Sequence, residues 1–401
     1  MQFKLLNFHK FVGNFAASLV GTFIPLMIYK VTGSIRLAVL FLLGQGACRL
    51  AANHIFKKMY NKYPQLTLIL RIIPLLIYNI SLIFLDKFMV AGIILVSVSY
   101  GTNLSFKNNA DGVLLNYTSK NRTSKNLTLT RIVDALSAIV ASVAGGLFID
   151  WNQTALIIFS TGLYLVSVLP LFFYYLANRK KSGFNKDFTS NAAIAYDQDP
   201  LLKQKRRKIV KHFVIQYFLF YAIFCVIDPF TNMYTLHMFT TAPTFAMAGY
   251  LSATFQLSNL AGVLLVGYIS KHSDLKNANF IFGLICAVPL GIIPFIRLYV
   301  AIYLLIFVFG FSYAICSYFM MNSLMTKCKI ISANNKALLA RQDGIIVGQM
   351  VTPIVVLIFN NIIPVFFVMI AALIFYSIYT RIYEERLRQK LVNYLQNNEI
   401  E

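Results

Sequence analysis

A stripe of polar side chains crosses an otherwise apolar stretch at residues 97–112, SVSYGTNLSFKNNADG. Tyr100, Asn103, Lys107 and Asp111 recur at spacings of three, four and four, which places them on one face of a helix. A face this polar does not suit lipid, so we expect it to line a water-filled cavity. The Lys107 ammonium would hold an anionic or polar substrate group, while Asp111 would accept a proton or a cation. Within the span the two residues could form an ion pair, which a proton or cation on Asp111 would release. The alternative is that the helix ends earlier and leaves both residues in a solvated cytoplasmic loop.

Arg49 is the most deeply placed basic residue in a second apolar stretch, and Gln45 lies one helical turn before it. Neither side chain easily reaches a membrane surface. Arg49 is therefore a candidate to bind substrate, or to form a buried structural bond with Asp111 or Asp134.

Asp228, which precedes Pro229, is a lone acid in the outer half of an apolar stretch. Protonation avoids burying a charge there, so Asp228 is the first candidate for proton coupling and Asp111 the second. The alternative role for Asp228 is to accept hydrogen bonds from backbone amides freed by the proline kink.

Two further acid–base pairs open apolar stretches in related positions, Arg131 with Asp134 and Arg341 with Asp343. Such pairs suit a gate, because they can exchange partners as two halves of a protein move apart. The alternative is a solvated helix end.

A second group of candidate cavity residues lies in the second half of the chain. Gln256 and Asn259 share a helix face, and Tyr313 and Tyr318 offer aromatic walls. These types suit hydrogen bonding and stacking of an amphiphilic ligand.

The composition places all these residues in a bilayer. Hydrophobic residues make up 58% and charged residues 12% of the 401 residues, and the mean hydropathy is +0.67. Basic residues gather at the termini and in alternate connections, and the other connections hold only Lys30, Arg36, Lys87 and Arg297. This pattern predicts cytoplasmic termini. The net charge of +22 therefore faces lipid headgroups, which argues against nucleic-acid binding.

We predict an all-α polytopic protein with twelve transmembrane helices of about 20 apolar residues each. The expected spans are 9–31, 36–56, 65–85, 88–116, 127–149, 153–177, 209–237, 243–269, 277–296, 299–325, 337–359 and 361–383. They divide the chain into a six-helix bundle at 1–177, a basic cytoplasmic linker at 178–208, a second bundle at 209–383 and a cytoplasmic tail at 384–401. The tail has the composition of a short amphipathic helix on the membrane surface.

The chain offers little to hydrolytic, cofactor or metal chemistry. Its five cysteines form no CxxC pair, and no phosphate-binding GxxxxGK[ST], HExxH or GxSxG motif occurs. We therefore expect neither an enzyme nor a bound metal or cofactor.

The two halves align as copies of one another. Residues 100–131 superpose on 310–341 without a gap, which pairs Arg131 with Arg341. Similar offsets pair Pro25 with Pro229 and Pro74 with Pro289. Repeats of this kind are typical of secondary transporters.

Twelve spans in two parallel halves, a basic central loop and cytoplasmic termini resemble the major facilitator superfamily over essentially the whole chain. The family's loop signature, G-x-x-x-D-R-x-G-R-K, remains in part as GYISKHSDLK at 267–276, with Lys271 at the place of the acid. The sequence ANHIFKKMYNK at 52–62 keeps only the basic residues. In the family this loop helps to latch one closed state.

A second family pattern, the exporter motif G-x-x-x-G-P-x-x-G-G, survives as small residues in the fifth span. They are Ser137, Ala141, Ser142, Gly145 and Gly146, with Ser142 in place of the proline. The segment IYKVTGS at 28–34 is also similar to the macrolide-type drug-efflux branch.

The resemblance implies a secondary transporter that works by alternating access, and we expect proton-coupled efflux of a small amphiphilic compound. Uptake symport or facilitated passage of a polar metabolite, and lipid flipping by the same fold, are the alternatives. The expected partners are the substrate, a proton or other coupling ion, and membrane lipids, around a monomer. The abundance of Lys, Asn, Ile and Phe indicates a microbial genome rich in A and T, so we place the protein in a bacterial plasma membrane.

Overall fold

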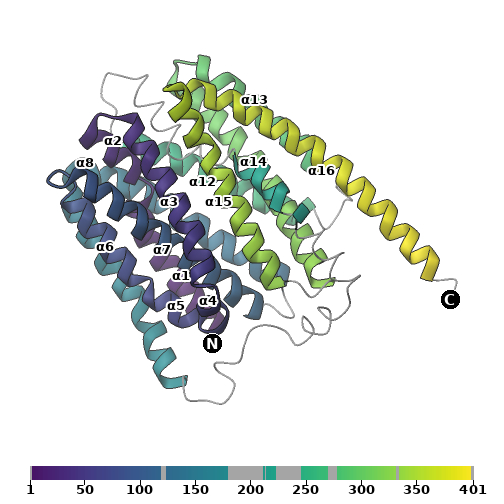
Figure 1. The fold of residues 1–401 in the computed structure, drawn as a ribbon, viewed down its shortest axis with the longest axis horizontal. Helices are drawn as coiled ribbons and strands as arrows, with labels where there is room; N and C mark the ends of the chain where they lie inside the picture. The colour runs from purple at the N-terminus through teal and green to yellow at the C-terminus, as the bar shows by residue number, and fades with distance from the viewer. Residues whose placement is uncertain are drawn as a thin grey trace.

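In the computed structural model, the protein is a bundle of long helices, and its described part contains no strand (Figure 1). The structure describes residues 2–118, 123–178, 211–212, 214–222, 245–269, 278–330 and 334–398. The central linker, most of the seventh expected span with Asp228, and most of the family loop at 267–276 lie outside the described residues.

The described helices agree closely with the spans expected from hydropathy. They are α1 (Gln2–Gly21), α2 (Ile24–Thr32), α3 (Ile35–Ile55), α4 (Lys57–Lys62), α5 (Pro64–Leu70), α6 (Ile72–Ile83), α7 (Met89–Thr118), α8 (Thr123–Asn178), α12 (Phe245–Ile269), α13 (Ala278–Ile292), η2 (Ile293–Phe295), α14 (Tyr299–Ile330), α15 (Asn334–Phe359) and α16 (Ile363–Asn398). In the described residues, nine helices are long and apolar enough to cross a membrane, and 280–295 forms a shorter apolar helix. The protein is an integral membrane protein.

Two expected spans are each broken once, four residues before a proline. The first span divides between α1, which ends at Gly21, and α2, which contains Pro25. The third divides between α5, which ends at Leu70, and α6, which contains Pro74. A proline lacks the amide proton that would bond the carbonyl four residues earlier, and its ring crowds that carbonyl. Both breaks therefore have a local cause in the sequence, although the helices that contain Pro170, Pro289 and Pro353 continue past those prolines.

The fifth and sixth expected spans meet at a sharp turn within α8. The backbone of Asn152 is extended (φ −158°, ψ 103°), and its side-chain oxygen accepts a hydrogen bond of 2.9 Å from the backbone N–H of Ala155. An asparagine in this position caps the start of the next helix. The 56-residue α8 thus supplies two spans, as predicted.

The two halves of the bundle meet where small residues allow helices to touch. A Cβ atom added at Gly146 of α8 would lie 2.5 Å from the backbone oxygen of Phe245, at the start of α12. One turn further along α12, Gly249 is packed just as closely against Ser142, and the Ser142 hydroxyl donates to Ser252 over 3.1 Å. The small residues of the fifth span thus form a contact between halves.

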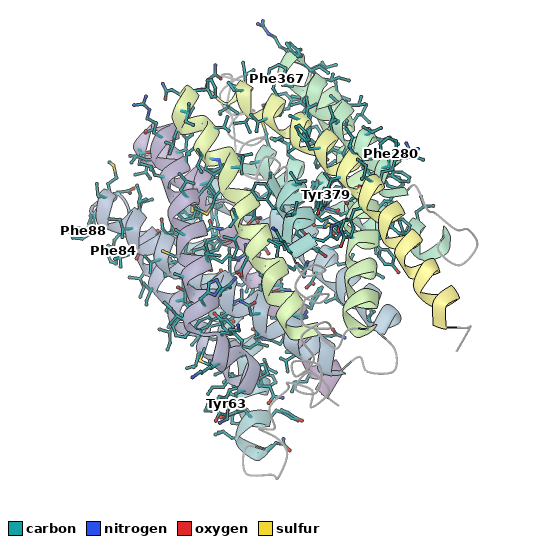
Figure 2. All side chains as sticks on the ribbon, turned by 45° about the vertical axis from the view of Figure 1, so that its right-hand side comes forward. Tyr63, Phe84, Phe88, Phe280, Phe367 and Tyr379 are labelled. Carbon is teal, nitrogen blue, oxygen red and sulfur yellow. The ribbon has the colours of Figure 1, made fainter. Side chains whose placement is uncertain are left out.

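The outer surface of the bundle is apolar, as a surface in contact with lipid requires. Phe84, Phe88 and Phe367 are 45%, 64% and 51% exposed, and they project from the bundle in Figure 2. The C-terminal tail departs from the expected boundary, because α16 continues past residue 383 as one helix to Asn398 and extends away from the bundle (Figure 1).

Candidate functional site

A cavity of about 460 Å³ lies between the two halves. Helices α1, α2, α3 and α7 line it from the first half, α14, α15 and Tyr221 line it from the second, and Arg71 enters from the break between α5 and α6. This volume is typical of small-molecule sites, which span roughly 300 to 1,000 Å³. The polar lining residues are Ser18, Thr22, Gln45, Arg49, Arg71, Tyr100, Asn103, Lys107, Asn108, Tyr221, Tyr313, Arg341, Gln342 and Gln349.

The polar stripe of α7 faces this cavity along three of its four positions. Tyr100, Asn103 and Lys107 line the cavity, whereas Asp111, one turn further on, does not. The Asp111 carboxylate forms an ion pair with Lys10 of α1, with 3.3 Å between Nζ and Oδ2, and the two side chains are 14% and 5% exposed. Because α7 runs on to Thr118, Asp111 lies inside the helix and not in a solvated loop.

Arg49 joins the two halves across the cavity. Its Nη1 donates to Gln349 over 3.0 Å, and its Nη2 donates to Gln342 over 2.9 Å. Both glutamines belong to α15, so the partners of Arg49 include neutral amides of the other half. Gln45, one turn earlier on α3, also lines the cavity.

Arg71 is a cavity residue that the sequence interpretation missed. It is 2% exposed, its Nε donates to Asn103 over 3.0 Å, and its guanidinium carbon lies 5.1 Å from the Tyr164 ring centre. A cation over an aromatic face is favourable where water is excluded. The available signal was a lone arginine within the apolar run at 65–85.

The four residues predicted to form gates take separate positions. Arg341 lines the cavity, with its guanidinium carbon 5.1 Å from the Tyr217 ring centre. Asp134 accepts a hydrogen bond of 2.6 Å from Asn14, within the first half. The side chain of Arg131 lies outside the described residues. Asp343 alone of the four makes a described bond between halves.

We call the end of the bundle near α4 the basic end, and the end near Asn152 the opposite end; α4 lies close to the chain's N-terminus in Figure 1. At the basic end, Asp343 of α15 accepts a hydrogen bond of 3.2 Å from Asn53 of α3 and lies 3.6 Å from the His54 ring nitrogen Nε2.

A buried network on the first half orients Asn53 for this contact. The Asn53 side-chain oxygen accepts hydrogen bonds of 2.6 Å from both Ser105 and Asn109, which leaves its amide group to donate to Asp343. Tyr60 lies 2.8 Å from the Ser105 hydroxyl, and burial raises the pKa of Tyr60 to about 12. The network therefore keeps its neutral donors at any physiological pH.

The halves also touch at the opposite end. Arg36 Nε at the start of α3 donates to the Asn360 side chain over 2.9 Å. Asn360 follows α15 with a positive φ of 49°, a conformation that asparagine tolerates better than most residues. Near the turn of α8, the Asp150 carboxylate accepts backbone hydrogen bonds of 3.1 Å from Phe245 and 3.0 Å from Ala246.

Of the remaining residues that the sequence predicted for the cavity in the second half, one lines it and two do not. Tyr313 lines the cavity and stacks on Phe220, with 4.9 Å between ring centres. Gln256 and Asn259 of α12 are not among the described residues that line it. The described part of the chain holds no group of three or more His, Cys, Asp or Glu side chains arranged for a metal ion.

Electrostatically, the cavity is basic. Arg49, Arg71, Lys107 and Arg341 all line it, and none of its described lining residues is Asp or Glu. A polar cavity between two bundles of membrane-spanning helices is typical of secondary transporters.

Comparison with known proteins agrees with this class. Residues 10–334 match the model of the Major Facilitator Superfamily. The chain therefore belongs to that superfamily, and it is a transporter and not an enzyme. No curated protein sequence matches the chain.

Solved structures of two transporters share the fold. A mutant of nucleoside transporter NupG is 17% identical, with a TM-score of 0.65 over 94% of this chain and 98% of that chain. A bacterial homologue of the iron transporter ferroportin in its outward-facing state is 11% identical, with a TM-score of 0.68 over 96% of this chain and 100% of that one.

Proposed function

We propose that this protein carries a small polar solute across the membrane by alternating access, and that the solute binds in the cavity between the two halves. The cavity lining is the observation that carries this proposal. In a bilayer, side chains such as Arg49 and Lys107 are costly to bury, so they are kept at sites where a solute or an ion passes.

The same lining favours a polar solute over the amphiphile that the sequence suggested first. An amphiphile needs apolar walls, whereas 14 of the 22 residues that line this cavity bear amide, hydroxyl or cationic side chains. The nucleoside and iron transporters of the same fold are named for polar or charged solutes, which supports this choice. Proton-coupled export of an amphiphile remains a prediction.

The contacts at the two ends of the bundle suit alternating access. The Asn53–Asp343 bond closes part of the basic end, and the Arg36–Asn360 bond closes part of the opposite end. Both join α3 to the region of α15, so a rocking motion of one half against the other would break one bond while keeping the other. We assign these two bonds to the gates.

Asp111 is the residue that we assign to proton coupling. It lies one turn from Lys107 at the edge of the cavity, and its Oδ1 atom is buried without a hydrogen-bond partner among the described residues. A proton added to Asp111 would weaken its ion pair with Lys10 and change the charge next to the cavity. Asp228, the first sequence candidate, stays a prediction outside the described residues.

Transport by purified protein in liposomes tests the proposal. Labelled pools of polar metabolites, lipophilic cations and lipids are followed with and without a pH gradient. We expect protein-dependent movement of a polar pool that the gradient accelerates, and we expect Asp111→Asn to remove the acceleration. Exposed Lys58 supplies the control, because Lys58→Gln changes a charge on α4 away from the cavity.

Movement of lipophilic cations or labelled lipid, with every polar pool left in place, would overturn the proposal in favour of an exporter of amphiphiles or a flippase. Transport by Asp111→Asn that still follows the pH gradient would remove Asp111 from coupling and leave the polar substrate standing.

A further inference from the structure

The charged side chains that line the cavity are all positive among the described residues. Arg49, Arg71 and Lys107 enter from the first half, and Arg341 enters from the second. They come from four separate segments of the chain, so the array is not the accident of one basic helix face. None of the described lining residues supplies a carboxylate in return.

The hydrogen bonds described for Arg49 and Arg71 go to neutral side chains. Arg49 donates to two glutamines, Arg71 donates to Asn103, and Arg341 lies against the ring of Tyr217. Neutral partners hold guanidinium groups in place without cancelling their charge. The Nε atom of Arg341 is buried and has no hydrogen-bond partner among the described residues.

Three described carboxylates that interact electrostatically with Lys107 or Arg49 already have other partners. Asp111 pairs with Lys10, Asp134 accepts from Asn14, and Asp343 accepts from Asn53. Among the described side chains, Lys10 and the four lining cations supply five positive charges, and these three carboxylates supply three negative ones. The described part of the site thus holds an excess of two positive charges, which an occupant with two negative charges would neutralise.

We propose that the substrate is a small organic anion with two negative charges, such as a phosphate monoester or a dicarboxylate. This inference rests on the proposed function and names its substrate class. One arginine guanidinium group can donate two parallel hydrogen bonds to two oxygens of a phosphate or carboxylate group, whereas a lysine ammonium acts as a point charge. Several arginines around one cavity therefore suit a ligand with several anionic oxygens. Tyr100, Tyr221 and Tyr313 then contact the uncharged body of the molecule.

Binding to the purified full-length protein tests the inference directly. Each of two probe pairs sets a dianion against a neutral molecule with the same body: adenosine monophosphate against adenosine, and succinate against its neutral diamide. We expect at least one dianion to bind tenfold or more tightly than its neutral partner, with affinity that falls as salt rises. The pair that shows the preference separates phosphate esters from dicarboxylates.

Variants assign the binding to the cavity. Lys107→Gln and Arg341→Gln are each expected to weaken dianion binding at least tenfold, whereas Lys107→Arg keeps the charge and retains most of the affinity. Lys58→Gln, on the exposed surface of α4, leaves it unchanged. The conservative arginine variant separates loss of charge from loss of folding.

Equal affinity for a dianion and its neutral partner, or dianion binding that survives in both glutamine variants, would overturn the inference. Transport of a neutral polar pool by a protein that binds no dianion would also overturn it, while the proposed function would stand. Failure of every polar pool in liposomes would overturn the proposed function instead.

Discussion

Several charged side chains of this protein lie within membrane-spanning helices, where neighbouring side chains pair with them or donate and accept hydrogen bonds. Lys10 and Asp111 are paired over 3.3 Å with side chains 5% and 14% exposed. Arg71 is held by Asn103 and by the face of Tyr164. Charges so enclosed depend on their partners, because water does not replace a lost one.

The ion pair between Lys10 and Asp111 gives a prediction at this scale. Lys10→Met leaves the Asp111 carboxylate buried without its cation, which costs roughly 3 to 5 kcal/mol in buried pairs of soluble proteins. We expect a clear fall in the thermal unfolding temperature in detergent. The double variant Lys10→Met with Asp111→Leu removes both charges and should recover most of the loss. A double variant as unstable as the single one would show that the pair itself does not stabilise the bundle.

Helices meet in this protein where glycine removes the side chain. Gly146 on α8 faces the start of α12, and Gly249 on α12 faces Ser142 of α8. In α15, a Cβ atom added at Gly348 would lie 2.5 Å from the backbone oxygen of Phe218. Close packing replaces the hydrophobic effect as the force between helices in lipid.

Two glycines of the same helix supply a matched test of this packing. Gly146→Val would push its side chain into the backbone of Phe245, whereas a Cβ atom at Gly162 meets no atom within 4 Å. Overpacking costs about 1 to 3 kcal/mol, so we expect Gly146→Val to lower the unfolding temperature and transport. Gly162→Val should change neither. If the two variants had the same unfolding temperature and the same transport rate, the close contact between α8 and α12 would not be needed for stability or transport.

The whole molecule works, in our proposal, by movement of one half against the other. Its two gate bonds span residues 36 and 360 at one end and residues 53 and 343 at the other. The hydrogen bond of 2.8 Å between Asn79 and Thr161, in contrast, joins two helices of the same half. Of these three contacts, only the first two must break during transport.

Cysteine cross-links test this difference in a background without the native cysteines. Cross-linking Arg36→Cys to Asn360→Cys, or Asn53→Cys to Asp343→Cys, should lower transport at least tenfold, and a reductant should restore it. Cross-linking Asn79→Cys to Thr161→Cys within the first half should leave transport nearly intact. Full transport by either cross-linked gate pair would contradict the assigned gates.

The sequence by itself determined the apolar spans and their order. Hydropathy over about 20 residues predicts a span without knowledge of its neighbours. The chemistry of proline accounts for the breaks before Pro25 and Pro74, but it does not determine them alone, because Pro170, Pro289 and Pro353 lie within continuous helices. The helical period also predicted that Tyr100, Asn103 and Lys107 share a face, and these three residues line the cavity.

Only the tertiary structure decided which partners these residues meet. Asp111 pairs with Lys10, about a hundred residues away, and not with Lys107 four residues away. Arg49 bonds two glutamines of α15, which its place in the sequence did not indicate. A helical period shows which side chains lie together on one helix, but the facing helix is set by packing across the bundle. The acid-free, basic lining of the cavity is therefore a property of six or more segments brought together, which no single segment of the sequence reveals.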